Sequence, residues 1–304
     1  MSADAQPQSG NGRAYLVLAV AALCWAANAV FGRLAVGEIS PMLLVSLRWL
    51  GVFLLLCIFA QQHVKRDWPV LRTRLVFIGA MGALGFAIFN ALFYVAAHST
   101  TAVNLGILQG SVPVFVILGM FLAHRVRVTK IQIAGVMVTL IGVAIVATGG
   151  SIERLTALAF NIGDLLMLAA CALYSGYTVG LRQRPDASAL GLFTLLVAAA
   201  FVTTIPLVGA EAWLGQLQWP TPKGWIIVSL VTLFPSFLAQ ICFMQGVSLI
   251  GPNRAGVFVN LVPVFASILA VSFLREPFEY FHAAALLLVL GGIWLSERGK
   301  ADAR

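Results

Sequence analysis

The chain has 304 residues, of which 61% are apolar and 10% are charged. Soluble domains are roughly half apolar and about a quarter charged, so this composition argues against a soluble enzyme, a disordered chain or a disulfide scaffold and favours a polytopic membrane protein. The net charge of +8 arises from short basic clusters between apolar runs, which is typical of cytoplasmic loops and not of a nucleic-acid-binding surface.

Ten apolar segments are long enough to cross the hydrocarbon core as helices, which takes about 20 residues each. We therefore expect an all-α polytopic membrane protein with ten transmembrane helices. Residues 1–13 are rich in Ser, Gly, Gln and Asn and are predicted to form a disordered cytoplasmic tail. The first span is longer than a signal-peptide core and is expected to be retained. The expected spans are 14–35, 41–60, 75–96, 102–123, 129–148, 163–182, 188–208, 224–247, 253–274 and 279–297.

The distribution of Lys and Arg predicts the orientation of these spans. If the N-terminus is cytoplasmic, fourteen of these residues fall on the cytoplasmic side of the membrane and four on the outer side. Cytoplasmic loops of membrane proteins carry the excess of basic residues, so both termini are predicted to be cytoplasmic. The expected location is the inner (cytoplasmic) membrane of a bacterial-type cell, with residues 298–304 as a second cytoplasmic tail.

The two halves of the chain resemble each other at an offset of 150 residues. The sequence Val-Pro-Val-Phe at 112–115 recurs at 262–265, and Arg125 corresponds to Arg275. Five spans in each half mean that the second half enters the membrane from the opposite face. We therefore predict two inverted five-helix repeats, 14–150 and 151–297, with a substrate site near the midplane between them. The alternative is duplication for structure alone, in a receptor or a channel.

Several segments resemble the EamA-type repeat of the drug/metabolite transporter superfamily. The sequence Leu-Cys-Trp-Ala-Ala-Asn at 23–28 and Arg48 look like the opening of such a repeat, and the Gly-punctuated segment 102–148 looks like its end. That ending pattern returns in 252–297. Its turn reads Arg-Glu-Pro, whereas the first repeat has Arg-Val-Arg where the family commonly has a Glu. The resemblance implies a ten-helix EamA-like transporter, with YddG-like amino-acid exporters as a candidate subgroup and amino acids or amphipathic metabolites as substrates.

The sequence contains no pattern that supports catalysis or metal binding. It has no Gly-rich phosphate loop before a helix and no His-Glu-x-x-His motif. The four histidines are scattered and are expected at membrane interfaces, and the four cysteines lie inside apolar runs as small hydrophobic residues. We therefore expect no enzyme activity, no catalytic residue, no metal site and no cofactor.

Polar and aromatic side chains inside the spans are the candidates for a substrate site, because an amide buried in hydrocarbon without a hydrogen bond costs roughly 2–7 kcal/mol. Asn28 shares a helix face with Trp25, and Asn90 shares one with Tyr94 and Phe86. The alternative role for each is helix–helix packing. The candidates, repeat mates included, are Trp25, Asn28, Phe86, Asn90, Tyr94, Gln109, Tyr174, Tyr177, Gln240 and Asn260.

Three further residues are candidates for gating. Arg48 is the basic residue that lies well inside a span. It is interpreted either as a structural anchor whose side chain reaches toward the outer face, or as a gating group or a partner for a substrate carboxylate. Pro113 and Pro263 free backbone carbonyls within their spans and are hinge candidates. The fifth and tenth spans are almost entirely aliphatic, so we expect them to face lipid or another copy, in a monomer or a weak homodimer.

The leading functional hypothesis is export of small metabolites, above all amino acids, by alternating access around a central midplane cavity. Nearly all Asp and Glu residues lie at or beyond span ends, and Asp164 enters its span by only one or two residues, as a helix-start residue. Proton coupling needs a titrating group in the pathway, so facilitated diffusion is favoured. The alternatives are a proton-coupled drug/metabolite antiporter and a passive channel. The expected partners are a small-molecule substrate and the lipid bilayer, without nucleic acid.

Overall fold

The computed structural model describes residues 9–126, 128–151, 153 and 160–301. Within these ranges the chain is helical, without strands, and ten helical runs are long and apolar enough to cross a membrane. The expected all-α fold with ten candidate spans is therefore confirmed. The first helix begins at Ser9, inside the segment expected to be a tail. Residues 1–8 and 302–304, together with Arg127 and Arg154 of the charge count, lie outside the described residues.

The helical elements follow one another with short connections. Their bounds in chain order are α1 Ser9–Ala35, α2 Pro41–Phe59, α3 Gln61–Leu71, η1 Arg72–Arg74, α4 Leu75–Gly82, η2 Ala83–Ile88, α5 Phe89–Ala96, α6 Ala102–Gln109, α7 Val112–His124, α8 Lys130–Ala147, α10 Ile162–Gly180, η3 Leu181–Gln183, α11 Ala189–Trp213, α12 Pro222–Val231, η4 Thr232–Leu238, α13 Ala239–Ile250, α14 Pro252–Val257, η5 Phe258–Leu261, α15 Val262–Leu274 and α16 Tyr280–Ala301.

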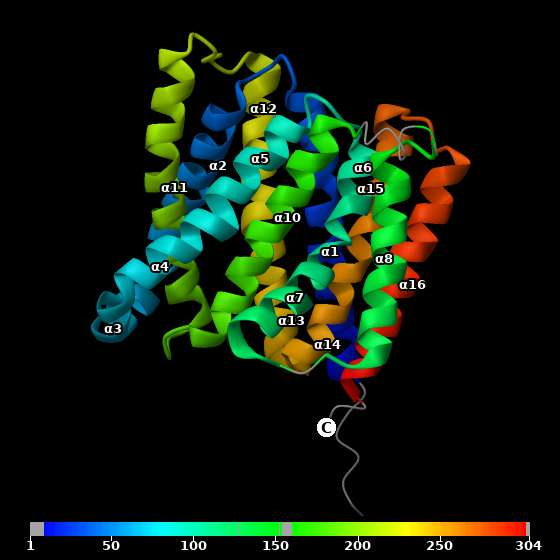
Figure 1. The fold of residues 1–304 in the computed structure, drawn as a ribbon. Helices are drawn as coiled ribbons and strands as arrows, with labels where there is room; N and C mark the ends of the chain where they lie inside the picture. Colours follow the sequence, from blue (N-terminus) through cyan, green and yellow to red (C-terminus); the bar gives the residue numbers. More distant parts are fainter. Residues whose placement is uncertain (1–8, 127, 152, 154–159, 302–304) are drawn as a thin grey trace, which may run out of the picture.

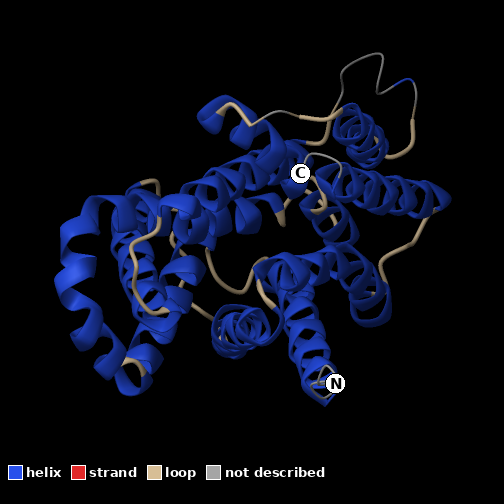
Figure 2. Cartoon of the chain, turned by 90° about the horizontal axis from the view of Figure 1, so that it is seen from below, coloured by secondary structure: helices blue, strands red, loops and turns tan. Residues whose placement is uncertain are grey.

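The elements stand side by side in one bundle (Figure 1). Helices α2 and α11 lie toward one edge of it, and α8 and α16 lie at the other. The first helix begins and the last helix ends at the lower end of this view, and Figure 2 looks at the bundle from that end. We call this the terminal end, and we call the opposite end, where the α5–α6 and α15–α16 connections lie, the distal end.

The expected fourth and ninth spans are both interrupted. The first breaks between α6 and α7, and the second narrows into the 3-10 segment η5 before α15. Pro113 and Pro263 occupy the first turns of α7 and α15, where a missing N–H costs no helix hydrogen bond. Both helices then end at an arginine in the left-handed conformation, Arg125 with φ 50° and Arg275 with φ 54°. The breaks and the helix ends thus recur at the same offset as the sequence motif.

The third and eighth helical runs also share an irregularity. Each contains a π-helical segment, η2 between α4 and α5 and η4 between α12 and α13. Pro235 in η4 has no N–H to continue the α-helical ladder, which favours a wider turn there. Single π-helical turns leave backbone carbonyls free for other donors and occur often at functional sites. The sequence did not predict them, because they preserve the apolar character of the spans.

The connection expected between the second and third spans is itself a helix, α3. Its sequence, Gln-Gln-His-Val-Lys-Arg-Asp-Trp-Pro-Val-Leu, mixes polar residues with a buried apolar side chain, Leu71. Such a helix suits the interface between lipid and water. Asp67 accepts two hydrogen bonds from Ser188, one from its backbone N–H at 2.8 Å and one from its hydroxyl. These bonds attach α3 to the start of α11.

Helices α8 and α16 pack against each other along their length. A Cβ atom added at Gly292 would lie 2.5 Å from the carbonyl oxygen of Gly135 and against the Thr139 hydroxyl. Glycine is therefore required there for the two backbones to approach this closely. The outer faces of the pair are apolar and exposed, through Met137 and Leu287 among others, as expected for helices that face lipid or another copy.

We predict that Gly292→Ala lowers the free energy of unfolding by about 1–3 kcal/mol, because the new methyl group overpacks the contact with α8. The measurement is thermal unfolding of the purified protein in detergent micelles. Gly291→Ala is the matched control, since a Cβ atom at Gly291 meets nothing within 4 Å. Equal melting temperatures for the two variants would contradict the close contact.

Candidate functional site

The guanidinium of Arg48 lies inside the bundle, where only 4% of the residue is exposed. Its Nε donates a hydrogen bond to Ser236 Oγ at 2.5 Å. Its Nη1 donates to Asn28 Oδ1 at 3.0 Å, Asn90 Oδ1 at 2.7 Å and the Tyr94 hydroxyl at 2.6 Å. Arg48 therefore links α1, α2, α5 and η4 inside the bundle. We call these five residues the Arg48 centre.

The two π-helical segments supply groups to this centre. In η2 the freed carbonyl of Phe86 accepts hydrogen bonds from Trp49 Nε1 at 3.2 Å and from Asn90 Nδ2 at 2.7 Å. In η4 the Ser236 hydroxyl donates to the carbonyl of Val231, five residues earlier, at 2.5 Å. Its oxygen thereby remains the acceptor for Arg48. Each irregular turn thus orients one polar side chain toward the guanidinium.

The side chains that hold Arg48 are all neutral. A charge removed from water is costly unless it is paired and hydrogen-bonded, and here amide, phenol and hydroxyl oxygens provide the compensation. The Arg48 guanidinium also lies 4.9 Å from the Trp49 ring centroid, which adds a cation–π contact. Among the described residues, Nη2 of Arg48 has no hydrogen-bond partner.

A row of aromatic rings extends from the Arg48 centre toward the second half of the chain. The Phe86 ring contacts Trp49 at 5.0 Å and Tyr177 at 5.4 Å between centroids. Tyr177 contacts Tyr174 at 5.4 Å, and Tyr174 contacts Phe89 at 5.0 Å. Within the described part of the chain, neither tyrosine hydroxyl of this row has a hydrogen-bond partner.

The structure thus brings together six of the ten predicted substrate residues. Asn28, Asn90 and Tyr94 hold Arg48, and Phe86, Tyr174 and Tyr177 form the adjacent aromatic row. Two others lie apart from them: Trp25 packs on Phe243, and the Gln109 amide donates to Leu105 of its own helix at 3.4 Å. Gln240 is half-buried on α13, close in sequence to η4.

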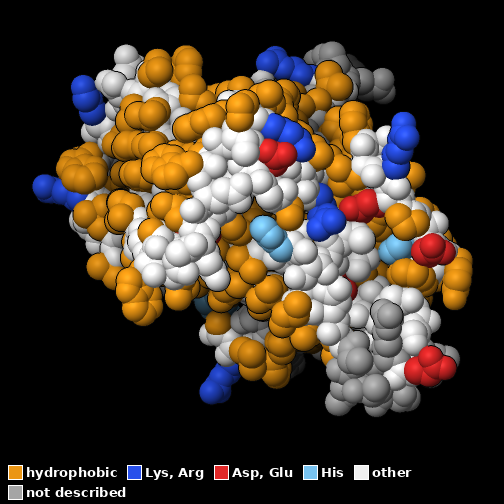
Figure 3. Space-filling model, turned by 90° about the horizontal axis from the view of Figure 1, so that it is seen from above, with side chains coloured by type: hydrophobic (Ala, Val, Ile, Leu, Met, Phe, Trp, Pro, Cys, Tyr) orange, Lys and Arg blue, Asp and Glu red, His pale blue; other side chains and the backbone are white. Residues whose placement is uncertain are grey.

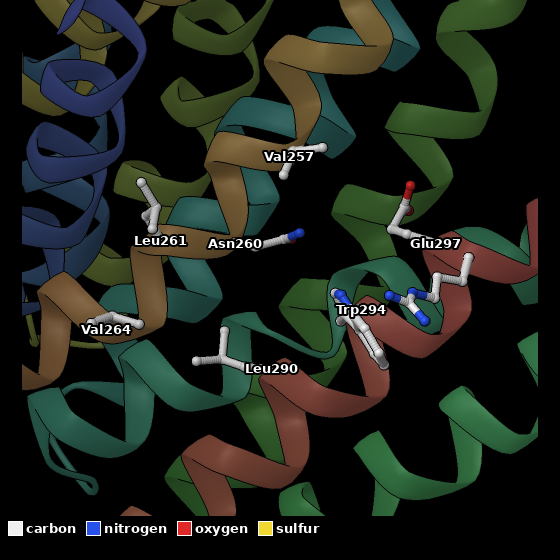
Figure 4. A pocket seen from close by; sticks show the side chains of 8 residues that line it. Val257, Asn260, Leu261, Val264, Leu290, Trp294 and Glu297 are labelled. Atoms are coloured by element: carbon white, nitrogen blue, oxygen red, sulfur yellow. The ribbon is translucent and has the colours of Figure 1, made fainter. Parts of the chain in front are cut away.

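Asn260 lies in a different place, a cavity of about 510 Å³ between η5–α15 and α16. Figure 4 shows its amide pointing into the cavity, toward the side where Glu297 and Trp294 lie, with Leu261, Val264 and Leu290 on the opposite side. This cavity shares no lining residue with the Arg48 centre, so the predicted substrate residues do not form one continuous site.

A second polar network, absent from the sequence predictions, lies at the distal end. Asp164 is 1% exposed and accepts a hydrogen bond from Thr100 Oγ1 at 2.5 Å and one from Asn104 Nδ2 at 3.3 Å. Asn104 Oδ1 lies 3.2 Å from Nε2 of His282. Asp164 lies in the first turn of α10, as expected for a helix-start residue, and the N-cap is Asn161, whose side chain accepts from Gly163 N at 2.7 Å.

His282 lies in the first turn of α16, near a span end as expected, and is 5% exposed. Its Nδ1 accepts from the Glu279 backbone N–H at 2.9 Å, so its Nε2 carries the proton and donates to Asn104. The network therefore joins α6, α10 and α16. Pairing polar residues across span ends could have suggested it, but its contacts link residues far apart in the sequence, which no local spacing reveals.

At the distal end, carboxylates from the second half of the chain also cap the starts of helices in the first half. Glu276 accepts from the backbone N–H groups of Ala102 and Val103 at 3.0 Å, and Glu211 does so from Met42 at 3.1 Å. These contacts satisfy N–H groups that a helix start leaves free. Figure 3 shows acidic, basic and histidine side chains gathered on this face of the molecule.

A loop carboxylate joins the halves there as well. Glu38 accepts hydrogen bonds from the Thr221 hydroxyl and from Lys223 Nζ, the latter at 3.1 Å. These two donors hold the pKa of the Glu38 carboxyl below its usual range. The distal end is therefore closed by polar contacts that run between the two halves.

Comparison with known proteins identifies the family to which this chain belongs. The model of the EamA-like transporter family matches residues 12–148 and again residues 161–298. The chain belongs to the EamA-like transporter family. Its members are membrane transporters, which confirms that the protein is a multi-pass transporter of the drug/metabolite superfamily and not an enzyme.

Similar curated proteins carry the same general description. The Uncharacterized transporter YetK of Bacillus subtilis is 28% identical over 93% of this chain and 86% of that protein. The Uncharacterized inner membrane transporter YedA of Escherichia coli is 22% identical over 91% of this chain and 88% of that protein. A solved crystal structure with 18% identity covers 93% of this chain and 95% of that chain with a TM-score of 0.62, which shows the same fold.

We predict that Tyr94→Phe lowers the free energy of unfolding by about 1–3 kcal/mol, because Arg48 and Asn28 each lose a buried hydrogen bond. The measurement is again thermal unfolding in micelles. Tyr15→Phe serves as the matched control, since Tyr15 is exposed and stacks on Phe258 through its ring. An unchanged melting temperature for Tyr94→Phe would contradict the bonds assigned to its hydroxyl.

Proposed function

We propose that this transporter exports small metabolites, with amino acids as the main class, from the cytoplasm across the inner membrane. The observation that carries the proposal is the Arg48 centre, a buried polar site held by residues of both halves. Asn28, Asn90 and Tyr94 come from the first half and Ser236 comes from the second. Neutral oxygens, one guanidinium and the adjoining aromatic row suit small amino acids with apolar side chains, the class that the resemblance to YddG-like exporters implies.

Alternating access between two inverted repeats is the proposed mechanism. Its support is the recurrence of three irregular features at offsets of about 150 residues: the π-helical segments, the proline-marked breaks and the left-handed arginines. Figure 1 also shows α6–α7 running from the distal to the terminal end and α14–α15 running the opposite way. Discontinuous helices in corresponding positions are typical of transporters that rock one repeat against the other.

The sidedness of the proposal rests on charge. Basic residues concentrate in the connections at the terminal end, so this end is assigned to the cytoplasm. The polar contacts between the halves gather at the distal end, which corresponds to the outside. The described conformation is accordingly assigned to a state in which the outer end is closed.

Amino-acid transport is tested with purified protein in proteoliposomes and a panel of labelled amino acids. We expect saturable uptake, accelerated by unlabelled substrate trapped inside the vesicles, because a carrier exchanges substrate as it reorients. Vesicles without protein provide the background. The absence of any zwitterion flux above that background would refute the substrate class, and flux that never saturates would instead support a channel.

Facilitated diffusion is the proposed driving mode, and proton antiport is the second candidate. The Arg48 centre contains no Asp, Glu or His, which favours transport without a proton. The antiport alternative is favoured by Asp164, a buried carboxylate joined to His282 through Asn104.

We predict that an imposed pH gradient, with the membrane potential clamped, drives no concentrative accumulation in proteoliposomes. Asp164→Asn should retain equilibrative flux within about threefold of the unmodified protein, as expected when no proton cycle depends on the carboxylate. Accumulation that follows the pH gradient and disappears in Asp164→Asn would establish antiport instead.

A further inference from the structure

The Arg48 guanidinium has donors that the protein does not use. Nε and Nη1 are engaged by Ser236, Asn28, Asn90 and Tyr94, whereas Nη2 has no partner among the described residues. Nη2 is also not fully buried. Within the described part of the chain, His63 Nδ1 alone is a fully buried side-chain nitrogen or oxygen without a hydrogen bond. Nη2 therefore keeps a small accessible surface, within a residue that is 4% exposed.

The charge of Arg48 is compensated only in part. Hydrogen bonds donated by Arg48 to neutral oxygens spread the charge, but none of these four partners supplies a negative charge. In a low-dielectric interior, an anion beside a guanidinium gains far more than it does in water. Arginine presents its N–H groups in a planar fork that fits a carboxylate. An incoming carboxylate is thus the partner that completes this centre.

We infer that Arg48 is the binding group for a substrate carboxylate, through Nη2, and that the substrates are monocarboxylates with an apolar or aromatic body. This inference rests on the proposed function and narrows it. The body of the substrate would lie along the row of Trp49, Phe86 and Tyr177, which begins beside the guanidinium. The free hydroxyls of Tyr174 and Tyr177 add neutral hydrogen-bonding groups to that row.

The same geometry implies that a substrate needs no ammonium group in order to bind. The side chains of the Arg48 centre and of the aromatic row include no carboxylate. The buried carboxylate Asp164 belongs to the distal network and is held by Thr100 and Asn104. A substrate ammonium would thus meet neutral oxygens alone, while the Arg48 charge would repel it. Carboxylates that lack the amino group are therefore expected to bind as well as the corresponding amino acids.

Three ligands of similar shape test this charge rule: L-phenylalanine, 3-phenylpropionate and 2-phenylethylamine. The first has both charged groups, the second only the carboxylate and the third only the ammonium. Binding to the purified protein is measured by calorimetry or ligand-induced thermal stabilisation, and transport by competition with labelled phenylalanine in proteoliposomes. We expect the first two to bind within about fivefold of each other, and the amine to bind at least tenfold more weakly, as one lost charge-assisted contact implies.

Substitutions of Arg48 distinguish a role of this residue in ligand binding from a role in folding. Arg48→Gln should weaken carboxylate binding at least tenfold and remove the discrimination against 2-phenylethylamine. Its former partners keep other bonds, Tyr94 to Asn28 and Asn90 to the Phe86 carbonyl, so the variant should still fold, with a melting temperature lowered by the loss of the Arg48 bonds, and binding is compared below that temperature. Arg48→Lys keeps the charge without the fork and should restore part of the affinity. Arg74→Gln removes an exposed arginine that bonds the Gln183 carbonyl and should leave binding unchanged.

The outcomes distinguish this inference from the proposed function. Equal binding of the amine and the carboxylates, unchanged carboxylate affinity in folded Arg48→Gln, or no binding of any of the three ligands overturns the inference. Phenylalanine transport that persists in those cases leaves the proposed function standing. Carboxylate-selective binding without any flux supports the inference and counts against amino-acid transport. If Arg48→Gln fails to fold, the ligand series on the unmodified protein and the Arg48→Lys variant decide the matter.

Discussion

One constraint organises the centre of this protein: a guanidinium lies inside a bundle whose surroundings are hydrocarbon. An unpaired charge there would be prohibitive, so the chain must deliver oxygens to Arg48 from several helices at once. It does so by folding two spans irregularly. The π-helical turns of η2 and η4 free a carbonyl and orient a hydroxyl, and α1 and α5 supply the remaining acceptors. These bonds attach α2 to α1, α5 and η4.

The sequence predicted much of this arrangement because its signals are local. The i, i+4 spacing of Asn90 and Tyr94 placed both on one helix face, and both hold Arg48. The cost of burying an amide predicted that Asn28 faces the bundle. The number of spans and the Val-Pro-Val-Phe repeat likewise followed from composition and spacing.

Other features were not predictable because they depend on contacts between distant residues. A π-helical turn changes hydrogen bonding without changing apolar content, so η2 and η4 left no signal in the sequence pattern. Asp164 and His282 each looked like a shallow residue at a span end. Their burial appears only once α6 brings Asn104 between them. Asn260 was grouped with the other candidates as a polar residue inside the ninth span, yet it lines a separate cavity beside α16.

The packing of α8 on α16 has a mechanical consequence. These are the last helices of the two matched segments, and their backbones approach closely where Gly135 faces Gly292 and where Gly142 meets the carbonyl of Ala285. Small residues at these positions leave no gap between the two helices. One helix belongs to each of the two matched segments of the chain, 12–148 and 161–298. The contact between α8 and α16 therefore joins the two halves of the chain along these helices.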